Sequence, residues 1–103
     1  FEGAITAFKC ATQGCTAEES CEVRQCNPDK DPMLPVNGLP LSPGTIDYYM
    51  TYGAVLAGMH RQSNGYCAEG MRVLAQVKAS EYVNDIILRN VNESEAICRY
   101  WGY

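Results

Sequence analysis

This sequence lacks a long apolar run and carries little positive charge. The longest apolar-rich stretch, residues 48–59, is shorter than the ~18 residues that a membrane-spanning helix needs, and it contains several hydroxyl groups. Eight Lys and Arg residues against twelve Asp and Glu give a formal net charge of −4. Nucleic-acid binders and proteins that dock on anionic membranes need a basic surface. We therefore expect no membrane span and no nucleic-acid partner, and docking on anionic membranes is disfavoured.

Catalytic motifs are also missing. The sequence has no nucleophile elbow, no zinc-protease motif, no phosphate-binding loop and no calcium-binding loop. Its one histidine, His60, lies at the end of an expected helix, where an imidazole commonly complements the helix dipole. The cysteine spacing, C-x4-C-x5-C-x4-C, fits neither paired zinc knuckles nor iron–sulfur ligation, and no C-x-x-C redox motif occurs. We predict no catalytic residue, no metal and no cofactor, and hence no enzyme.

What the sequence does contain is six cysteines in 103 residues. An even cysteine count in a short chain is typical of secreted domains that supplement a modest core with disulfides. We predict a single domain over 1–103, located outside the cell, in which every cysteine is oxidised: Cys10, Cys15, Cys21, Cys26, Cys67 and Cys98. The chain opens at Phe1 without a leader, which we interpret as a mature chain after removal of a signal peptide.

Two of these cysteines lie on an expected helix. Thr16 and Glu19 have the spacing of a capping box, which predicts a helix over 17–26. On that helix the Cα atoms of Cys21 and Cys26 are about 8–9 Å apart, beyond the ~7 Å that a disulfide tolerates. We therefore predict that these two do not pair with each other. At least one of them is expected to reach Cys67 or Cys98 and so tie the two halves of the chain together.

The middle of the chain contains a loop followed by a second helix. Residues 27–44 hold all five prolines, which predicts a long loop without regular structure. The stretch 45–61 predicts the longer helix, with Thr45 at its start and His60 and Arg61 in its last turn. Small residues on this helix, Gly53, Ala54 and Ala57, permit close packing against another element.

The remaining segments read best as strands. Alternation of apolar and polar residues, or β-branched content, favours strands at 1–9, 71–78, 83–91 and 95–103. The expected fold class is α+β, with one short and one longer helix packed on an antiparallel sheet of three to four strands. The alternative is an all-α, disulfide-stapled bundle. In that alternative Ser80 caps a helix, Asp85 pairs with Arg89, and Asn92 forms a capping box with Glu95.

Aromatic residues supply the candidate binding surface. Tyr48 and Tyr52 share one face of the expected helix, and Tyr100, Trp101 and Tyr103 cluster near the C-terminal end of the sequence. Tyrosine and tryptophan are typical interface anchors because they bury much area while keeping a polar tip. Asn92 begins an N-x-S sequon in a polar stretch expected to be an exposed turn, which marks the chain as a possible glycoprotein.

Together these features predict a secreted, disulfide-rich protein that binds another macromolecule: a protein or other cell-surface partner. An effector, a toxin, a signalling ligand or an inhibitor fits this description. The first alternative is a carrier of small apolar ligands, with the helical residues 45–59 and the four methionines lining a cavity. The second alternative is a small secreted hydrolase that uses His60 and an acidic partner. Oligomeric state is left open.

Overall fold

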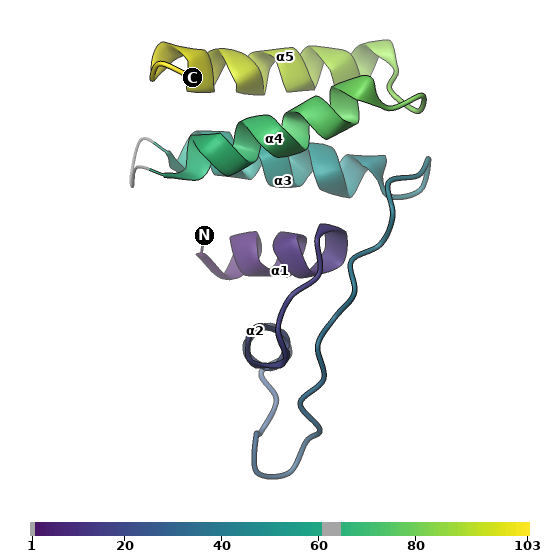
Figure 1. The fold of residues 1–103 in the computed structure, drawn as a ribbon, viewed down its shortest axis with the longest axis vertical. Helices are drawn as coiled ribbons and strands as arrows, with labels where there is room; N and C mark the ends of the chain where they lie inside the picture. The colour runs from purple at the N-terminus through teal and green to yellow at the C-terminus, as the bar shows by residue number, and fades with distance from the viewer. Residues whose placement is uncertain (1, 61–64) are drawn as a thin grey trace. The chain divides into compact units, whose positions relative to one another are not determined.

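The computed structural model describes residues 2–60 and 65–103, which form helices joined by loops (Figure 1). The chain divides into two compact units, Phe1–Pro40 and Leu41–Tyr103, each described by itself below as unit 1 and unit 2. Unit 1 contains α1 (Glu2–Thr12) and α2 (Ala17–Arg24). Unit 2 contains α3 (Ile46–Met59), α4 (Tyr66–Ala79) and α5 (Asp85–Tyr100).

The α+β prediction is wrong, and the all-α alternative fits. Within the described ranges the only β pairing is an isolated bridge between Cys15 and Val36. The segments expected to be strands are helical instead: most of 1–9 lies in α1, 71–78 lies in α4, and 83–91 with 95–103 contribute most of α5. Residue 1 lies outside the described residues. The buried side chains of these segments recur at helical spacing, as Val73, Leu74 and Val77 do, and a short window also fits an alternating pattern.

Unit 2 is a three-helix arrangement in which α3 packs against both α4 and α5 (Figure 1). Its most buried side chains recur three or four positions apart along each helix, as one face of an α-helix requires. They include Leu56, Ala57, Val73, Leu74, Val77 and Val91. The helix predicted over 45–61 is confirmed as Ile46–Met59. Thr45 occupies the cap position, but its Oγ1 accepts a hydrogen bond from the Ser42 N–H instead of capping the helix.

The predicted close packing of this helix is also present. A Cβ atom placed on Gly53 would lie 2.6 Å from Leu74 Cδ2 and 3.6 Å from the Gly70 carbonyl oxygen. Across the same contact, a Cβ on Gly70 would lie 3.2 Å from the Leu56 Cβ. The two glycines therefore let α3 and α4 approach more closely than any larger residue would allow. Arg61, predicted to close the helix, lies outside the described residues.

The disulfide Cys67–Cys98 joins α4 to α5 across the core of unit 2. Both cysteines are fully buried, and their Cα atoms are 5.6 Å apart. The predicted long-range link from the N-terminal cysteines to Cys67 or Cys98 is therefore wrong, because these two bond to each other. The staple instead closes unit 2 on itself.

Unit 1 is held by two short-range disulfides. The capping box at Thr16 and Glu19 is confirmed, but α2 ends at Arg24 rather than at residue 26. Gln25 adopts a left-handed conformation with φ of 56°, and the Cys26 N–H donates to the Cys21 carbonyl at 2.9 Å. This turn brings the Cα atoms of Cys21 and Cys26 to 5.0 Å, and they form a disulfide. The prediction that they do not pair is wrong because it continued the helix too far.

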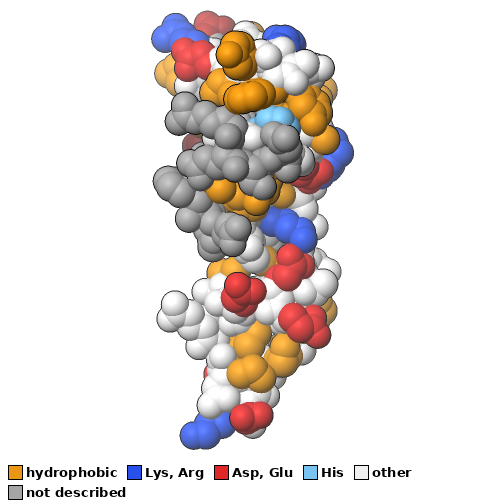
Figure 2. Space-filling model, turned by 90° about the vertical axis from the view of Figure 1, so that its left-hand side faces the viewer, with side chains coloured by type: hydrophobic (Ala, Val, Ile, Leu, Met, Phe, Trp, Pro, Cys, Tyr) orange, Lys and Arg blue, Asp and Glu red, His pale blue; other side chains and the backbone are white. Residues whose placement is uncertain are grey.

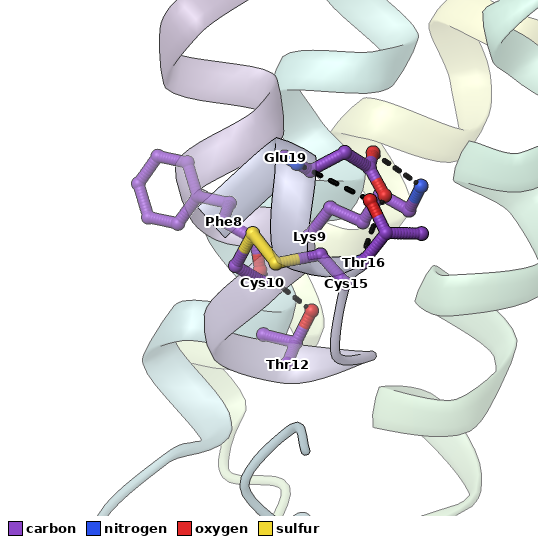
Figure 3. The surroundings of a disulfide bond; sticks show 7 residues. All are labelled: Phe8, Lys9, Cys10, Thr12, Cys15, Thr16 and Glu19. Atoms are coloured by element: carbon purple, nitrogen blue, oxygen red, sulfur yellow. Dashed lines mark hydrogen bonds and ion pairs between the residues drawn. A yellow bond between two sulfur atoms is a disulfide. The ribbon is translucent and has the colours of Figure 1, made fainter. Parts of the chain in front are cut away.

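The other staple of unit 1 joins Cys10 on α1 to Cys15 just before α2 (Figure 3). Beside it, Lys9 Nζ lies 2.8 Å from Glu19 Oε2 and so ties α1 to α2. Among residues 5–40, whose burial the structure describes, the buried side chains are small: Cys10, Thr12, Ser20 and Cys21. Because such side chains bury little apolar area, the Cys10–Cys15 disulfide contributes much of what holds α1 to the start of α2.

Residues 27–44 connect α2 to α3 without helical structure, and part of this segment returns to α1. The Leu39 N–H donates to the Ala11 carbonyl at 2.9 Å, and Val36 exchanges two main-chain hydrogen bonds with Cys15. Gly14 makes this approach possible: its φ is +86°, and a Cβ there would lie 2.6 Å from the Val36 oxygen. A stretch without regular structure is thus fixed to unit 1 by its backbone.

Candidate binding surface

The C-terminal aromatics are exposed at the end of α5. The helix ends at Tyr100, and the N–H groups of Trp101 and Tyr103 both donate to the Cys98 carbonyl at 3.0 Å. These bonds turn the chain back over the last turn of the helix. The exposed fractions are 83% for Tyr100, 43% for Trp101 and 50% for Tyr103. We call these three residues the aromatic patch.

Ring contacts hold two members of the aromatic patch in place. The Trp101 and Tyr103 rings lie 5.8 and 5.1 Å from the His60 ring, the second in an edge-to-face arrangement. Tyr100 meets Trp101 edge-to-face at 5.3 Å. Figure 2 shows hydrophobic side chains gathered around the pale-blue histidine on this side of unit 2. The aromatic patch is therefore anchored on a buried ring rather than projecting freely.

A shallow hollow lies beside the aromatic patch. It has a volume of about 400 Å³ and is lined by Ala96, Ile97, Tyr100 and Trp101. We call it the apolar hollow, because all four lining side chains are apolar or aromatic. Its volume lies within the ~300–1,000 Å³ range of small-molecule sites. Its chemistry suits an apolar group, either from a small molecule or from the surface of a partner.

A second hollow of about 440 Å³ continues along the same helix. Its lining is mixed, with two acidic residues and one basic residue among other side chains: Asp85, Leu88, Arg89, Asn92, Glu93 and Ala96. Ala96 lines both hollows, so they follow one another along α5. The exposed side of this helix therefore carries a charged section and an apolar section.

His60 has a structural position. Its side chain is buried, with 4% of the residue exposed, and Nδ1 accepts hydrogen bonds from the N–H groups of Gly65 and Cys67 at 3.3 and 3.1 Å. These donors belong to the start of α4, so the imidazole satisfies main-chain groups that the helix itself leaves open. Because Nδ1 is occupied by two donors, that atom is not available as a general base.

The two tyrosines predicted on one face of α3 have different surroundings. Tyr48 is 49% exposed, whereas Tyr52 is 3% exposed and belongs to the core. Tyr49 is also buried, and burial raises the pKa of its phenol above the ordinary value of 10.0. Tyr48 alone of these three therefore presents substantial surface, and the structure does not bring it into the aromatic patch.

The sequon lies on α5 rather than in a turn. Asn92 is exposed and faces the second hollow, but Ser94 of the same sequon is buried. The expected turn around it is wrong, because the helix runs unbroken through Tyr100. Whether Asn92 is glycosylated stays a prediction.

Sequence reasoning missed the aliphatic part of this surface. Ile86 and Ile97 are 69% and 43% exposed on α5, and Ala96 lines both hollows. With a strand assigned to 83–91 and another to 95–103, these residues belong to separate elements. A helical period counted through the polar residues between them places them along one helix face.

Outside the gap at 61–64, no helix of residues 2–103 has the length and apolar character to cross a bilayer. The same residues contain no cluster of three or more His, Cys, Asp or Glu side chains that could hold a metal ion. Comparison with known protein families, with curated proteins and with solved structures found no match.

Proposed function

We propose that this chain is a secreted, disulfide-stabilised binding protein that contacts another macromolecule through the aromatic patch and the apolar hollow. The observation that carries the proposal is the exposure of Tyr100, Trp101 and Tyr103 together at one end of unit 2. Exposed aromatics that converge beside an apolar depression are characteristic of binding surfaces. Three disulfides support an oxidising, extracellular location.

Preorganisation supports the same proposal. The Cys98 carbonyl accepts hydrogen bonds from the N–H groups of Trp101 and Tyr103, and the Cys98 side chain forms a disulfide with Cys67 in the core. The backbone that carries Trp101 and Tyr103 is thus attached directly to the covalent staple. Ordering a flexible side chain on binding costs about 0.5–1.5 kcal/mol. Anchors that are already held by ring contacts avoid part of this cost.

The experiment is selection of a random-peptide phage library on the immobilised, oxidised chain. Peptides that bind the unmodified chain and lose at least tenfold in binding to Tyr100→Ala or Trp101→Ala would support the proposal. Tyr48→Ala is the matched control, because it removes from the same unit an aromatic side chain whose exposed fraction, 49%, is close to the 43% of Trp101. Peptides that bind all three variants equally would contradict the proposed surface. Circular dichroism and intact mass would verify that each variant is folded and oxidised.

A second candidate function is favoured by the lining of the apolar hollow. Four apolar or aromatic residues around about 400 Å³ suit a small apolar ligand. The carrier site expected along 45–59 differs from this one, because all four residues that line the apolar hollow belong to 96–101. Titration with an apolar fluorescent dye, with Ile97→Glu as the comparison, tests this candidate. Saturable binding that the substitution abolishes would support a carrier, and a signal independent of residue 97 would exclude this hollow as its site.

A further inference from the structure

The exposed face of α5 carries an ordered set of side chains that extends from the apolar hollow toward the start of the helix. Ile86, Arg89, Glu93 and Ile97 are all exposed. At about 100° per residue they fall within about 80° of one another around the helix. We call these four residues the α5 stripe. Along the helix the stripe runs apolar, basic, acidic, apolar.

The α5 stripe is not part of the core of unit 2. Three buried apolar residues of the same helix, Ile87, Val91 and Cys98, lie on its opposite side. Ile86 is 69% exposed, although isoleucine is among the residue types most often found inside proteins. Two isoleucines flanking a pair of opposite charges, on a surface that also holds two hollows, indicate an interface.

The order of charges specifies which orientation of a second α5 fits. In a parallel pair of identical helices in register, Arg89 faces Arg89 and Glu93 faces Glu93, which is repulsive. In an antiparallel pair related by a two-fold axis near Val91, Arg89 of each copy faces Glu93 of the other. The same register sets Ile86 opposite Ala96 and next to Ile97. The stripe is therefore complementary to itself in the antiparallel orientation, as an isologous interface requires.

The hollows agree with that register. Ile86 of one copy lies over Ala96 and Ile97 of the other, where the apolar hollow offers about 400 Å³. The most exposed aliphatic side chain of the stripe thus meets an apolar depression, at two equivalent places in the pair.

We propose that the α5 stripe binds a second copy of this chain, forming an antiparallel, two-fold symmetric dimer with two Arg89–Glu93 ion pairs between copies. The proposal rests on the proposed function, because it names the macromolecule that occupies the same apolar hollow. Charge complementarity selects a second copy over a foreign partner: the stripe already contains, in reversed order, the groups that it needs opposite it.

The test is a charge exchange between copies, followed by sedimentation equilibrium of the full oxidised chain. Arg89→Glu sets a second acidic side chain against Glu93, and Glu93→Arg sets a second basic side chain against Arg89. We expect each single variant to weaken dimerisation at least tenfold. An equimolar mixture of the two variants is expected to form a heterodimer, because each acidic side chain of one copy then faces a basic side chain of the other. The double variant R89E/E93R, with both charges exchanged, is expected to dimerise again because each acidic group then faces a basic one.

The arrangement of charges in the two variants explains why mixing them should restore the dimer. The Arg89→Glu chain carries two acidic groups in the stripe, and the Glu93→Arg chain carries two basic groups. When one copy of each variant meets the other, both facing pairs join an acidic group to a basic group. Each variant alone can form only like-charged pairs. Recovery of the dimer in the mixture therefore reports direct contact between the two stripes.

Glu22→Arg in unit 1 is the matched control for Glu93→Arg, since it makes the same charge change at an exposed position on α2 and is expected to leave the dimer unchanged. A wild-type chain that stays monomeric at millimolar concentration overturns the proposal. So does a dimer that both single variants retain, or a mixture that does not recover. The proposed function is decided separately, by peptide selection on the Arg89→Glu variant, whose apolar hollow is not covered by a second copy and is not lined by residue 89. A monomer whose aromatic patch still selects peptides loses this inference alone, while loss of patch-dependent peptide binding by that variant removes the proposed function.

Discussion

Glu95 on α5 places its carboxylate 2.8 Å from the ammonium group of Lys78 on α4, although only 6% of the Glu95 side chain is exposed. Arg99 lies 3.6 Å from the same carboxylate oxygen. A carboxylate this deeply buried depends on its cations, because removing a partner leaves a charge with little solvation. Lys78 is 41% exposed and depends less on Glu95. The pair is therefore asymmetric.

This asymmetry predicts that Lys78→Met destabilises the protein by about 1–3 kcal/mol, since it withdraws the nearer cation from a buried acceptor. Replacing both members, as in Lys78→Met with Glu95→Leu, is expected to recover most of the loss because no buried charge is left. Urea unfolding measures all of these free energies. Arg72→Met is the control on α4: it removes an exposed pair with Glu69, and we expect less than about 1 kcal/mol. Equal losses of unfolding free energy in Lys78→Met and Arg72→Met would contradict the dependence of the buried Glu95 carboxylate on Lys78.

Replacing glycine by alanine is predicted to have opposite effects on stability at two positions of α3. Gly53→Ala places a Cβ 2.6 Å from Leu74 Cδ2 in a fully buried contact. We expect a net loss of about 1–3 kcal/mol from overpacking. Gly58 lies on the same helix with nothing within 4 Å of the added atom. Gly58→Ala is therefore expected to stabilise by about 0.5–1 kcal/mol through helix propensity. The melting temperatures of the two variants test both predictions. A higher melting temperature for Gly53→Ala would contradict the first, because it would show that α3 and α4 can separate without cost.

The helices missed from the sequence were hidden by an accidental alternation. In 71–78, Met71, Val73 and Val77 fit a strand pattern, and Leu74 is the exception to it. Leu74 indicates a helix instead, because Val73, Leu74 and Val77 together belong to the buried face of α4. A short window cannot separate period 2 from period 3.6 when apolar residues are this frequent. The helices with clear start signals, at 17 and 45, were predictable.

The cap of α5 was also misassigned. The sequence offered Ser80 and Asn92 as helix starts, whereas Asn84 is the residue whose side chain accepts from the Ile87 N–H at 2.8 Å. Ser80 instead follows the end of α4. The aromatic members of the binding surface could be found from the grouping of Tyr100, Trp101 and Tyr103 in the sequence. Its aliphatic members, Ile86 and Ile97, could not, because recognising them requires knowing that one helix carries both.

Glu19 predicts a pH dependence for unit 1. The hydrogen bond from Lys9, followed by that from the Thr16 N–H, lowers the pKa of this carboxyl below its ordinary value of 4.5. A lowered folded-state pKa contributes stability that is present above the unfolded-state value and is lost as pH falls through the folded-state value. We expect Glu19→Gln to lower stability at neutral pH and to have little effect once the carboxyl is protonated.

The Glu19 carboxyl can be followed directly by carbon-detected NMR titration, and thermal unfolding from about pH 7 downward follows the stability. Glu18→Gln is the control, because it removes a neighbouring negative charge from the first turn of α2. A Glu19 titration midpoint at or above the ordinary value would contradict the assigned hydrogen bonds. A pH profile that both variants alter equally would point instead to a general effect of charge at the helix N-terminus.

The disulfide pairing predicts a specific peptide map. Digestion of the unreduced chain with trypsin and a glutamyl endopeptidase separates the three cysteine pairs into different peptides. Residues 10–18 should then appear as one peptide with an internal disulfide, 20–22 should be joined to 25–30, and 62–69 should be joined to 96–99. A peptide joining 20–22 to 96–99 would contradict the structure and restore the long-range link that the sequence favoured.

The same pairing predicts unequal contributions to stability. Loop-closure entropy grows with the length of chain that a disulfide closes, and Cys67–Cys98 spans 31 residues whereas each staple of unit 1 spans 5. The chain-entropy relation gives about 3.5–4 kcal/mol for the long loop and about 2 kcal/mol for each short one. Replacing Cys67 and Cys98 together by alanine should therefore lower the free energy of unfolding of unit 2 by more than the equivalent double replacement of Cys10 and Cys15 costs unit 1. Urea unfolding followed by the single tryptophan, Trp101 in unit 2, should report the first loss and show little of the second if the two units unfold independently. If replacing Cys10 and Cys15 changes the tryptophan transition as much as replacing Cys67 and Cys98 does, the two units unfold together and the expected difference is contradicted.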